Sequence, residues 1–365
     1  MTEPFVESLE TDAFGAALMP PTLTRAFSLG DETPRIGKLV MPRAACLLAD
    51  GKHLVVVESG SSQLPVLSLD GTVVRQLVPE NRAFDDPCAV VRLPDEEDAL
   101  IVVDATGLTK LASTGAEITS FRSPYAVCYT HATLVGGVLY VADHVNSCVR
   151  AFDPATLQPR DELFGGPHDG SASYEADTLI EPVAVREHPD GVMVVDSGIG
   201  RILVFNPETG IVIKTWHTAL IRSGLTAPFD ALYHNGLLVV ADGAGVALLD
   251  AMSGAKLDAL PLREGAEPPP FARALIALPE PTDEPKEEKD DDAEEVLIVG
   301  CLEMLPQAAL HAFYVSGEGA PAPRASSALM QSSICQDFDV CVVGAGLVGC
   351  SIARDVASCG YKVLL

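Results

Sequence analysis

The sequence predicts an all-β fold, a six-bladed β-propeller over residues 22–317, followed at residues 337–365 by an incomplete Rossmann-type βαβ unit. Two observations predict this fold. A set of strand-like segments recurs six times, at spacings that match the roughly 40–50 residues of a propeller blade. Near the C-terminus, a glycine-rich turn separates an apolar strand from a helical stretch, which is typical of a nucleotide-binding βαβ unit.

The central strand of each predicted blade is a short apolar run rich in Val, Ile and Leu. Runs of this length and composition favour strands over helices. The six runs are LVVVES (54–59), LIVVDA (100–105), LYVADH (139–144), VMVVDS (192–197), LLVVAD (237–242) and VLIVGC (296–301).

A proline upstream of each central run opens another apolar stretch, which we expect to be a further strand of the blade. These prolines are Pro42, Pro87, Pro124, Pro182, Pro228 and Pro270. Their separations are 45, 37, 58, 46 and 42 residues, and we expect the variation to fall in loops. A third strand follows each central run, and most units continue into a fourth, such as EITSF or IVIKTWH.

The sixth unit has three evident strands and no fourth. A strand-like segment without a unit of its own, TLTRAFSLG (22–30), precedes the first blade. We expect this segment to pair at the outer edge of blade six, because this pairing closes the ring and covers an exposed strand edge.

An acidic residue recurs at one position near the end of the central run in five units, and the sixth unit is expected to have lost it. The five residues are Glu58, Asp104, Asp143, Asp196 and Asp242. We expect these carboxylates to accept hydrogen bonds from backbone N–H groups in the next turn, as Asp does at strand ends. The alternative is a calcium or lactonase-type metal site, which needs three or four converging oxygen ligands. Equivalent positions in different blades form a wide ring instead, so no metal site is predicted.

The third unit reads LYVADHVNSCVRAFDP and the fourth VMVVDSGIGRILVFNPETG. These units resemble the NHL-repeat family, whose pattern is an apolar run, Asp, Asn three residues on, Arg five residues on, and then an aromatic residue and a turn. Asp143 and Asn146 match in the third unit, where Cys148 takes the place of the Arg. Asp196 and Arg201 match in the fourth. The resemblance implies a propeller that binds protein, RNA or a small molecule, and a gluconolactonase-like metal-dependent hydrolase is the less favoured implication.

Three segments lie outside the predicted blades. Residues 1–21 form an N-terminal tail. Residues 279–295, PEPTDEPKEEKDDDAEE, carry ten acids and two lysines and are expected to be a disordered surface loop within blade six. The alternative is that this loop is a docking site for a basic partner. Residues 318–336 are rich in Ala, Pro and Ser and are expected to be a linker.

The composition limits the possible partners. The formal charge is −27, from 51 acidic and 24 basic residues, and such a surface repels nucleic acid and anionic membranes. The nine cysteines contain no C-x-x-C pair, which favours reduced thiols. The N-terminus lacks the basic region of a signal peptide, and no apolar run approaches the roughly 18–20 residues that span a bilayer. We expect a cytoplasmic protein.

The last segment reads FDVCVVGAGLVGCSIARDVASCGYKVLL (338–365). An apolar strand at 340–343 enters the glycine turn, a helical stretch follows at 347–358, and a second strand at 361–365. The turn would cradle a pyrophosphate through the backbone of the following helix N-terminus. The predicted cofactor-binding residues are Gly344, Ala345, Gly346, Leu347, Val348 and Gly349.

This segment resembles the opening of the FAD-dependent oxidoreductases of the D-amino-acid oxidase and glycerol-3-phosphate dehydrogenase superfamily. The resemblance implies FAD as the cofactor. In that family an acid at the end of the second strand binds the adenosine ribose, and here the chain stops at Leu365. We expect FAD binding only if the domain is completed, and we expect the downstream reading frame to supply that acid.

The histidines form no i,i+4 pair and no metal-ligand spacing. They are His53, His131, His144, His168, His188, His217, His234 and His311. Catalysis by His144 or His168 stays open as an alternative, because propeller loops carry sites. No catalytic residue is predicted.

Two functional hypotheses follow. In the first, the chain is an interaction module whose propeller faces bind a protein or a small-molecule ligand. In the second, it is the N-terminal part of an FAD-dependent oxidoreductase with a propeller placed in front.

Overall fold

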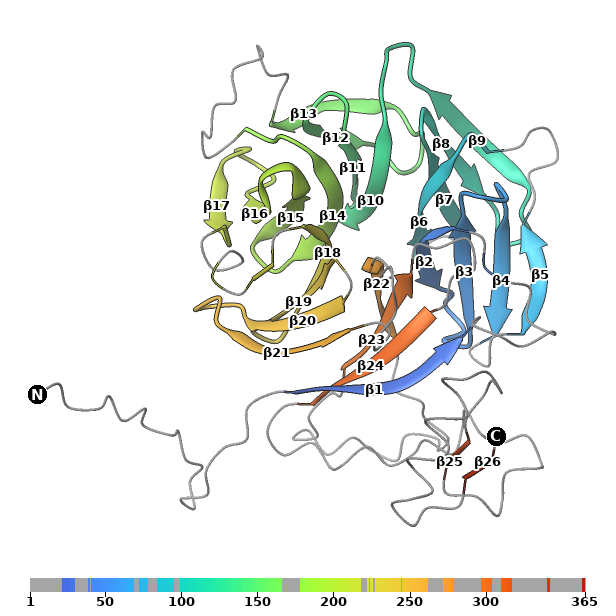
Figure 1. Cartoon of the computed structure of the whole chain (residues 1–365). Helices are drawn as coiled ribbons and strands as arrows, with labels where there is room; N and C mark the ends of the chain where they lie inside the picture. The colour runs from blue at the N-terminus through green and yellow to red at the C-terminus, as the bar shows by residue number, and fades with distance from the viewer. Residues whose placement is uncertain are drawn as a thin grey trace, which may run out of the picture.

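The computed structural model describes residues 22–29, 39, 41–68, 72–77, 84–94, 99–165, 178–217, 222, 224–225, 227–243, 245–261, 272–278, 297–303, 310–316, 340–341 and 363–364. Within these residues, six four-stranded antiparallel sheets surround a central axis (Figure 1). Each sheet is one blade. Its first strand in the chain lies nearest the axis, except in the blade that the N-terminal strand completes at its outer edge.

The first three blades follow one another directly along the chain. They consist of β2 (Pro42–Leu47), β3 (His53–Glu58), β4 (Leu64–Ser68) and β5 (Val73–Leu77); β6 (Pro87–Leu93), β7 (Ala99–Asp104), β8 (Gly107–Leu111) and β9 (Glu117–Arg122); and β10 (Tyr129–Val135), β11 (Val138–Asp143), β12 (Cys148–Phe152) and β13 (Pro159–Gly165).

The other three blades complete the ring. They consist of β14 (Pro182–His188), β15 (Gly191–Asp196), β16 (Arg201–Phe205) and β17 (Val212–Thr215); β18 (Pro228–His234), β19 (Leu237–Asp242), β20 (Gly245–Asp250) and β21 (Lys256–Pro261); and β22 (Ala272–Leu278), β23 (Leu297–Glu303), β24 (Leu310–Ser316) and β1 (Thr22–Leu29).

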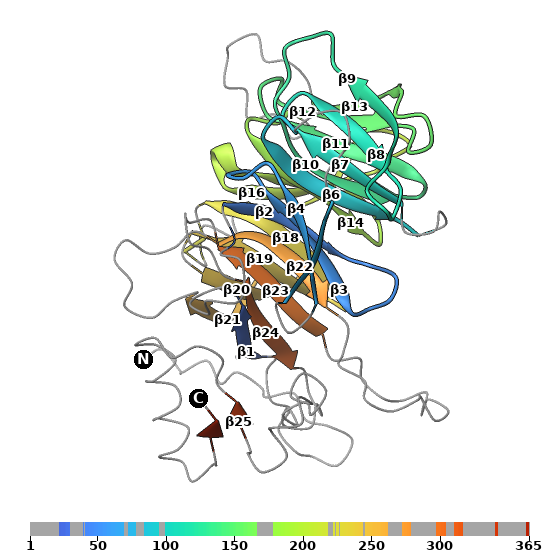
Figure 2. The same ribbon diagram turned by 90° about the vertical axis from the view of Figure 1, so that its right-hand side faces the viewer.

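The inner strands close the ring around the axis. Each of β2, β6, β10, β14 and β18 contacts the next inner strand, and β22 contacts β2. Figure 2 shows the same arrangement turned by 90°. The predicted all-β propeller is confirmed, and the named elements are strands apart from the short 3-10 helix η1 (Ser197–Ile199).

The outer edge of the last blade is supplied by the N-terminal strand. β1 pairs antiparallel with β24, from Thr22 opposite Ser316 to Leu29 opposite Leu310. The expected role of residues 22–30 is therefore confirmed. The pairing joins the two ends of the propeller by main-chain hydrogen bonds, as a closed ring requires.

The position of a strand in its blade explains its sequence. The second strands β7 and β15 are buried at every position, since both faces pack against neighbouring blades, and their sequences are continuous apolar runs. The outermost strand β17 alternates between half-buried and exposed residues, because one of its faces meets solvent.

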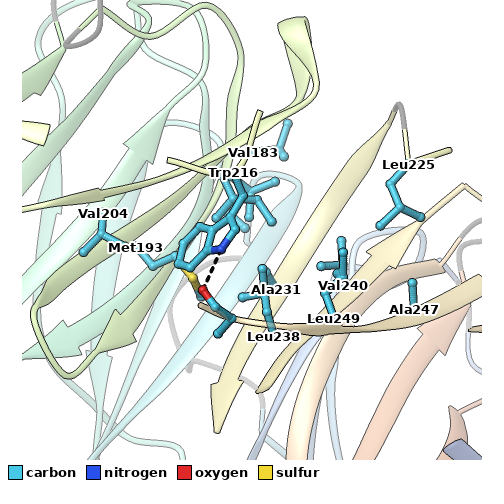
Figure 3. Close-up of a cluster of buried hydrophobic side chains, with 14 residues drawn as sticks. Val183, Met193, Val204, Trp216, Leu225, Ala231, Leu238, Val240, Ala247 and Leu249 are labelled. Carbon is cyan, nitrogen blue, oxygen red and sulfur yellow. Dashed lines mark hydrogen bonds between the residues drawn. The ribbon is translucent and has the colours of Figure 1, made fainter. Parts of the chain in front are cut away.

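The hydrophobic core lies between the faces of neighbouring blades. In the layer between β14–β17 and β18–β21, Met193 and Trp216 from one blade meet Leu238 and Val240 from the next (Figure 3). All four side chains are almost fully buried. Burial of each such side chain stabilises the fold by about 1.5–3 kcal/mol, so the blades depend on one another for their stability.

A β-bulge recurs near the start of every inner strand. The first residue of the strand pairs with the last residue of the second strand, and the next residue is skipped. The skipped register falls between Pro42 and Ala44, Pro87 and Ala89, Tyr129 and His131, Pro182 and Ala184, Pro228 and Asp230, and Ala272 and Ala274. Proline is tolerated here because a strand can begin at a residue without an N–H donor.

Two predictions about the repeat were wrong. The third inner strand begins at Tyr129, so Pro124 lies in the preceding connection. The sixth unit has not lost its acid: β23 extends to Glu303, which pairs with Ala272 at the same register position as the other five acids. The acid could not be recognised from the apolar run alone, because β23 continues two residues beyond that run and ends at Glu303.

The C-terminal segment is described only at two short strands. β25 (Val340–Cys341) and β26 (Val363–Leu364) pair in parallel. No Rossmann unit is seen within the described residues, because the glycine turn and the expected helix lie outside them. The expected tail (1–21), acidic loop (279–295) and linker (318–336) also lie outside them. Among the described residues, no helix is long and apolar enough to cross a bilayer.

Candidate functional site

The repeated acids have structural partners. Asp196 shows this most completely: its Oδ1 accepts the N–H groups of Ile180 (3.1 Å) and Glu181 (2.8 Å), and its Oδ2 accepts the Nε–H of Arg201 (3.0 Å). Asp196 and Arg201 are both buried. One carboxylate thus joins the end of the second strand to the segment that enters the inner strand.

Asp143 has equivalent partners in the third blade. It accepts the N–H of Cys128 (3.2 Å), the side-chain amide of Asn146 (2.7 Å) and the Nε–H of Arg150 (2.8 Å). Arg150 takes the role that the repeat pattern assigns to the position of Cys148. The arginine is supplied two residues further along β12, on the same face of the strand.

The other repeated acids whose side chains the structure describes have different partners. Asp104 forms a two-pronged pair with Arg122 of the outermost strand β9. Asp242 accepts the N–H of Ala227 (2.7 Å), and Glu58 accepts the hydroxyl of Ser61 (2.6 Å).

The expected backbone hydrogen bonds are present, but most donors precede the inner strand of the same blade. The following turn supplies fewer of them, such as Thr106 N–H to Asp104 (3.2 Å). In the part of the chain that the structure describes, no group of three or more His, Cys, Asp or Glu could hold a metal ion. Four of these acids therefore act as a girdle that holds one end of their blades: Asp104, Asp143, Asp196 and Asp242.

The other candidate residues from the sequence are scattered. The predicted cofactor residues, Gly344–Gly349, and the loop residue His168 lie outside the described residues. His144 follows β11, beside an Asp143 already bonded to Arg150 and Asn146. Cys88, Cys128 and Cys148 are free thiols, and burial raises the pKa of Cys88 far above its usual value.

A recess opens at the opposite ends of the inner strands from the acids. It has a volume of about 450 Å³ and lies where β10, β14 and β18 come together. Its lining includes Thr133, Arg186, His188, Tyr233 and Asn235. The register places this end at the turns after β14 and β18, since His188 pairs with Gly191 and His234 with Leu237.

His188 is the distinctive residue of this recess. It is only 4% exposed, and its ring lies 4.4 Å from the ring of Tyr233 and 6.0 Å from that of Trp216. Burial lowers the pKa of His188, so the imidazole is neutral near pH 7. Its Nδ1 accepts the N–H of Asp190 (3.1 Å), and the single ring proton must therefore lie on Nε2.

The Nε2–H of His188 is buried and finds no acceptor among the described residues. An unpaired buried donor costs about 1–3 kcal/mol, and buried polar groups normally have a partner. His188 lines the recess, so its wall contains a buried hydrogen-bond donor that has no acceptor among the described residues.

An ion pair between the half-buried Arg186 and the buried Asp230 lies at the inner wall of the same recess. Arg186 of β14 donates its Nε–H to Asp230 of β18 (2.9 Å), and Asp230 also accepts the N–H of Leu275 in β22 (2.8 Å). His131 lies nearby, and burial together with Arg186 lowers its pKa to about 3. Arg186 is thus held in place at the wall of the recess, where Asp230 balances its charge and the exposed Glu187 also lies.

Sequence reasoning missed this recess. The signal was present in the inner strands of two neighbouring units, which end in VREHPDG and ALYHNG with a histidine before the turn. One histidine at the end of an inner strand does not indicate a site. Histidines at this position in two adjacent blades do, because both line the same recess.

No family model matches the sequence, and no curated protein matches it. Solved structures of similar fold include hydrazine synthase of Kuenenia stuttgartiensis, at 15% identity over 74% of this chain and 79% of that chain, with a TM-score of 0.49. The Pan2 WD40 domain of Neurospora crassa is 10% identical over 82% of this chain and 96% of that chain, with a TM-score of 0.46. A nidogen/laminin complex is 14% identical over 61% of this chain and 80% of that chain, with a TM-score of 0.47. Such likenesses concern the fold alone.

Proposed function

We propose that the chain is a cytoplasmic binding module built on a six-bladed, NHL-like propeller. Its ligand is a small polar molecule that places a carbonyl or carboxylate oxygen against Nε2 of His188. The observation that carries this proposal is the buried Nε2–H without an acceptor in a recess of about 450 Å³. That volume lies in the range of small-ligand sites.

The neighbouring groups support the same ligand class. Arg186 and Asn235 add donors to the recess, and Tyr233 supplies an aromatic wall. An oxygen acceptor satisfies the histidine. Because Asp230 already balances the charge of Arg186, a neutral carbonyl suits the recess as well as a carboxylate. The girdle of acids lies at the other end of the inner strands and serves the fold.

The test follows His188 by NMR of histidine-labelled protein, with acetate and acetamide as probes. We expect the Nε2–H tautomer in the free protein and a saturable shift of the His188 signals with either probe. His53 of the first blade, which is half-buried and lies outside the recess, is the internal control. The His188→Phe variant keeps the aromatic packing and should lose the binding.

Two outcomes would contradict the proposal. One is that the ring proton of His188 in the free protein lies on Nδ1 in place of Nε2. The other is a probe response of His188 no larger than that of His53.

We propose, as a second candidate, that residues 338–365 begin an FAD-binding domain. The string VVGAGLVG and the parallel pairing of β25 with β26 favour it, since a βαβ unit places its two strands in parallel. Expression together with any in-frame downstream sequence should give a yellow protein with flavin absorbance. Gly346→Val should abolish the colour, and a colourless longer product would contradict this candidate.

A further inference from the structure

A second recess lies on the outer side of the propeller, between the outermost strand of the fourth blade and the fifth blade. Its volume is about 850 Å³, and no residue is shared with the lining of the recess at His188. One wall is the end of β17 with Trp216 and His217, and the other is the turn after β20 with the start of β21.

The charge of this recess is opposite to that of the whole chain. Lys214, Arg222 and Lys256 line it together with His217, and the described lining residues include no carboxylate. The nearby carboxylate of Asp250 is bonded to the backbone N–H and the hydroxyl of Ser253 (both 2.5 Å). Although burial opposes this, its pKa is lowered by these bonds and by the charge of Lys214. Three permanent cations thus gather at one concave site of a chain with a formal charge of −27.

Trp216 gives this site a rigid floor. The side chain is 3% exposed, and its Nε1–H donates to the carbonyl of Ala251 (3.0 Å), the bond drawn in Figure 3. Its ring packs in the core between the fourth and fifth blades. The ammonium of Lys214 lies 4.7 Å from the centre of the ring, which fixes this cation at the recess.

We propose that this recess binds a compact anion, the phosphate or carboxylate group of a small metabolite. Convergent Lys and Arg side chains are the groups that recognise such anions. The opposite charge of the remaining surface selects against long polyanions, because nucleic acid that reaches the recess must also cross the acidic surface. Met252, which is 92% exposed at the rim, offers an apolar contact for the rest of the ligand.

The only tryptophan of the chain is the reporter for the test. Pyrophosphate and citrate are titrated against the full chain, with the fluorescence of Trp216 as one measurement and titration calorimetry as the other. Binding moves the charge of Lys214 relative to the indole, so we expect a saturable change in emission. The calorimetric binding constant, which is independent of the reporter, should agree with it.

Matched double variants distinguish binding at this recess from a general effect of the protein's charge. Lys214→Gln/Lys256→Gln should weaken pyrophosphate binding at least about tenfold, or about 1.4 kcal/mol. Lys52→Gln/Arg75→Gln removes the same charge from exposed residues of the first blade and should change the binding constant less than about twofold. Lys214→Arg should retain binding.

The proposal is overturned if calorimetry detects no binding, or if both double variants weaken binding equally. Tighter binding of a single-stranded oligonucleotide than of pyrophosphate would also overturn it, because the selection against polyanions would then be absent. None of these outcomes depends on His188, so this site and the recess at the channel mouth can fail separately.

Discussion

In the third and fourth blades, a single buried carboxylate joins two separate parts of the blade. Asp196 accepts hydrogen bonds from the segment that enters β14 and neutralises Arg201 of β16, which is 5% exposed. The acid was visible in the sequence as a repeat, but its arginine partner differs from blade to blade. Only the structure shows that Arg122, Arg150 and Arg201 each form an ion pair with the repeated acid of their own blade.

Removal of this carboxylate should destabilise the propeller strongly. Asp196→Ala leaves Arg201 buried without a counter-ion and two backbone N–H groups without an acceptor, which together cost about 3–5 kcal/mol. Urea unfolding measures the loss. The control Glu208→Ala changes an exposed turn residue of the same blade and should stay within about 0.5 kcal/mol of the parent. A loss below about 1 kcal/mol for Asp196→Ala would show that the pair adds little.

His131 should make the fold sensitive to acid. Its folded pKa is lowered to about 3, below the value of about 6.5 in an unfolded chain. Between these values the unfolded chain binds a proton that the folded chain does not, so stability is lost as pH falls from about 6.5 towards 3. Arg186 and Arg273 face the imidazole and oppose its protonation, while Asp230 favours it.

The measurement is urea unfolding as a function of pH. His131→Asn keeps an acceptor for the N–H of Val185 and removes the titration, so its stability should fall less steeply below pH 6. The difference in slope from the parent should approach about 1.4 kcal/mol per pH unit. Equal slopes for the parent and His131→Asn would contradict the assignment.

At the scale of the strand, β1 supplies the only pairing that joins the start of the described propeller to its last blade. Deletion of residues 1–29 exposes the edge of β24, whose N–H and C=O groups then lack a partner. The midpoint of thermal unfolding should fall sharply and the protein should aggregate, as light scattering would show. Deletion of residues 1–21 alone is the matched control. If the midpoint of the longer deletion stays within a degree or two of that of the parent, β1 does not contribute to the stability of the ring.

Most of the strands could be predicted from the sequence. Continuous apolar runs predicted β3, β7, β11, β15 and β19 to within about a residue, because second strands are buried on both faces and have no polar side. Inner strands were harder, since they begin at a bulge whose first residue is proline in four blades, tyrosine in the third and alanine in the sixth. The recess at His188 could not be predicted, because it depends on side chains from three blades that only the ring brings together.

At the scale of the whole molecule, the ring depends on contacts between blades that are distant in sequence. The pair of Arg186 and Asp230, with the N–H of Leu275, connects three successive inner strands, β14, β18 and β22. Asp230 is 1% exposed, and its pKa is lowered by Arg186 and by hydrogen bonds although burial opposes this. Acid therefore weakens this connection as well, since a depressed carboxyl pKa gives stability that is lost as pH falls through it.

The contribution of the ion pair between Arg186 and Asp230 to the free energy of unfolding can be measured by substitution. Asp230→Asn keeps an acceptor for Leu275 but leaves the Arg186 charge without its counter-ion, which should cost about 3–5 kcal/mol. Arg186→Met/Asp230→Asn removes both charges and fills the space with an apolar side chain, so it should be more stable than the single Asp230→Asn variant. The physical reason is that an unpaired buried charge costs more than the absence of a pair. Urea unfolding of the parent, both single variants and the double variant gives the coupling free energy. A double variant that is less stable than Asp230→Asn would show that Arg186 stabilises the ring through contacts other than its ion pair, such as its bond to the carbonyl of Leu275 (2.6 Å).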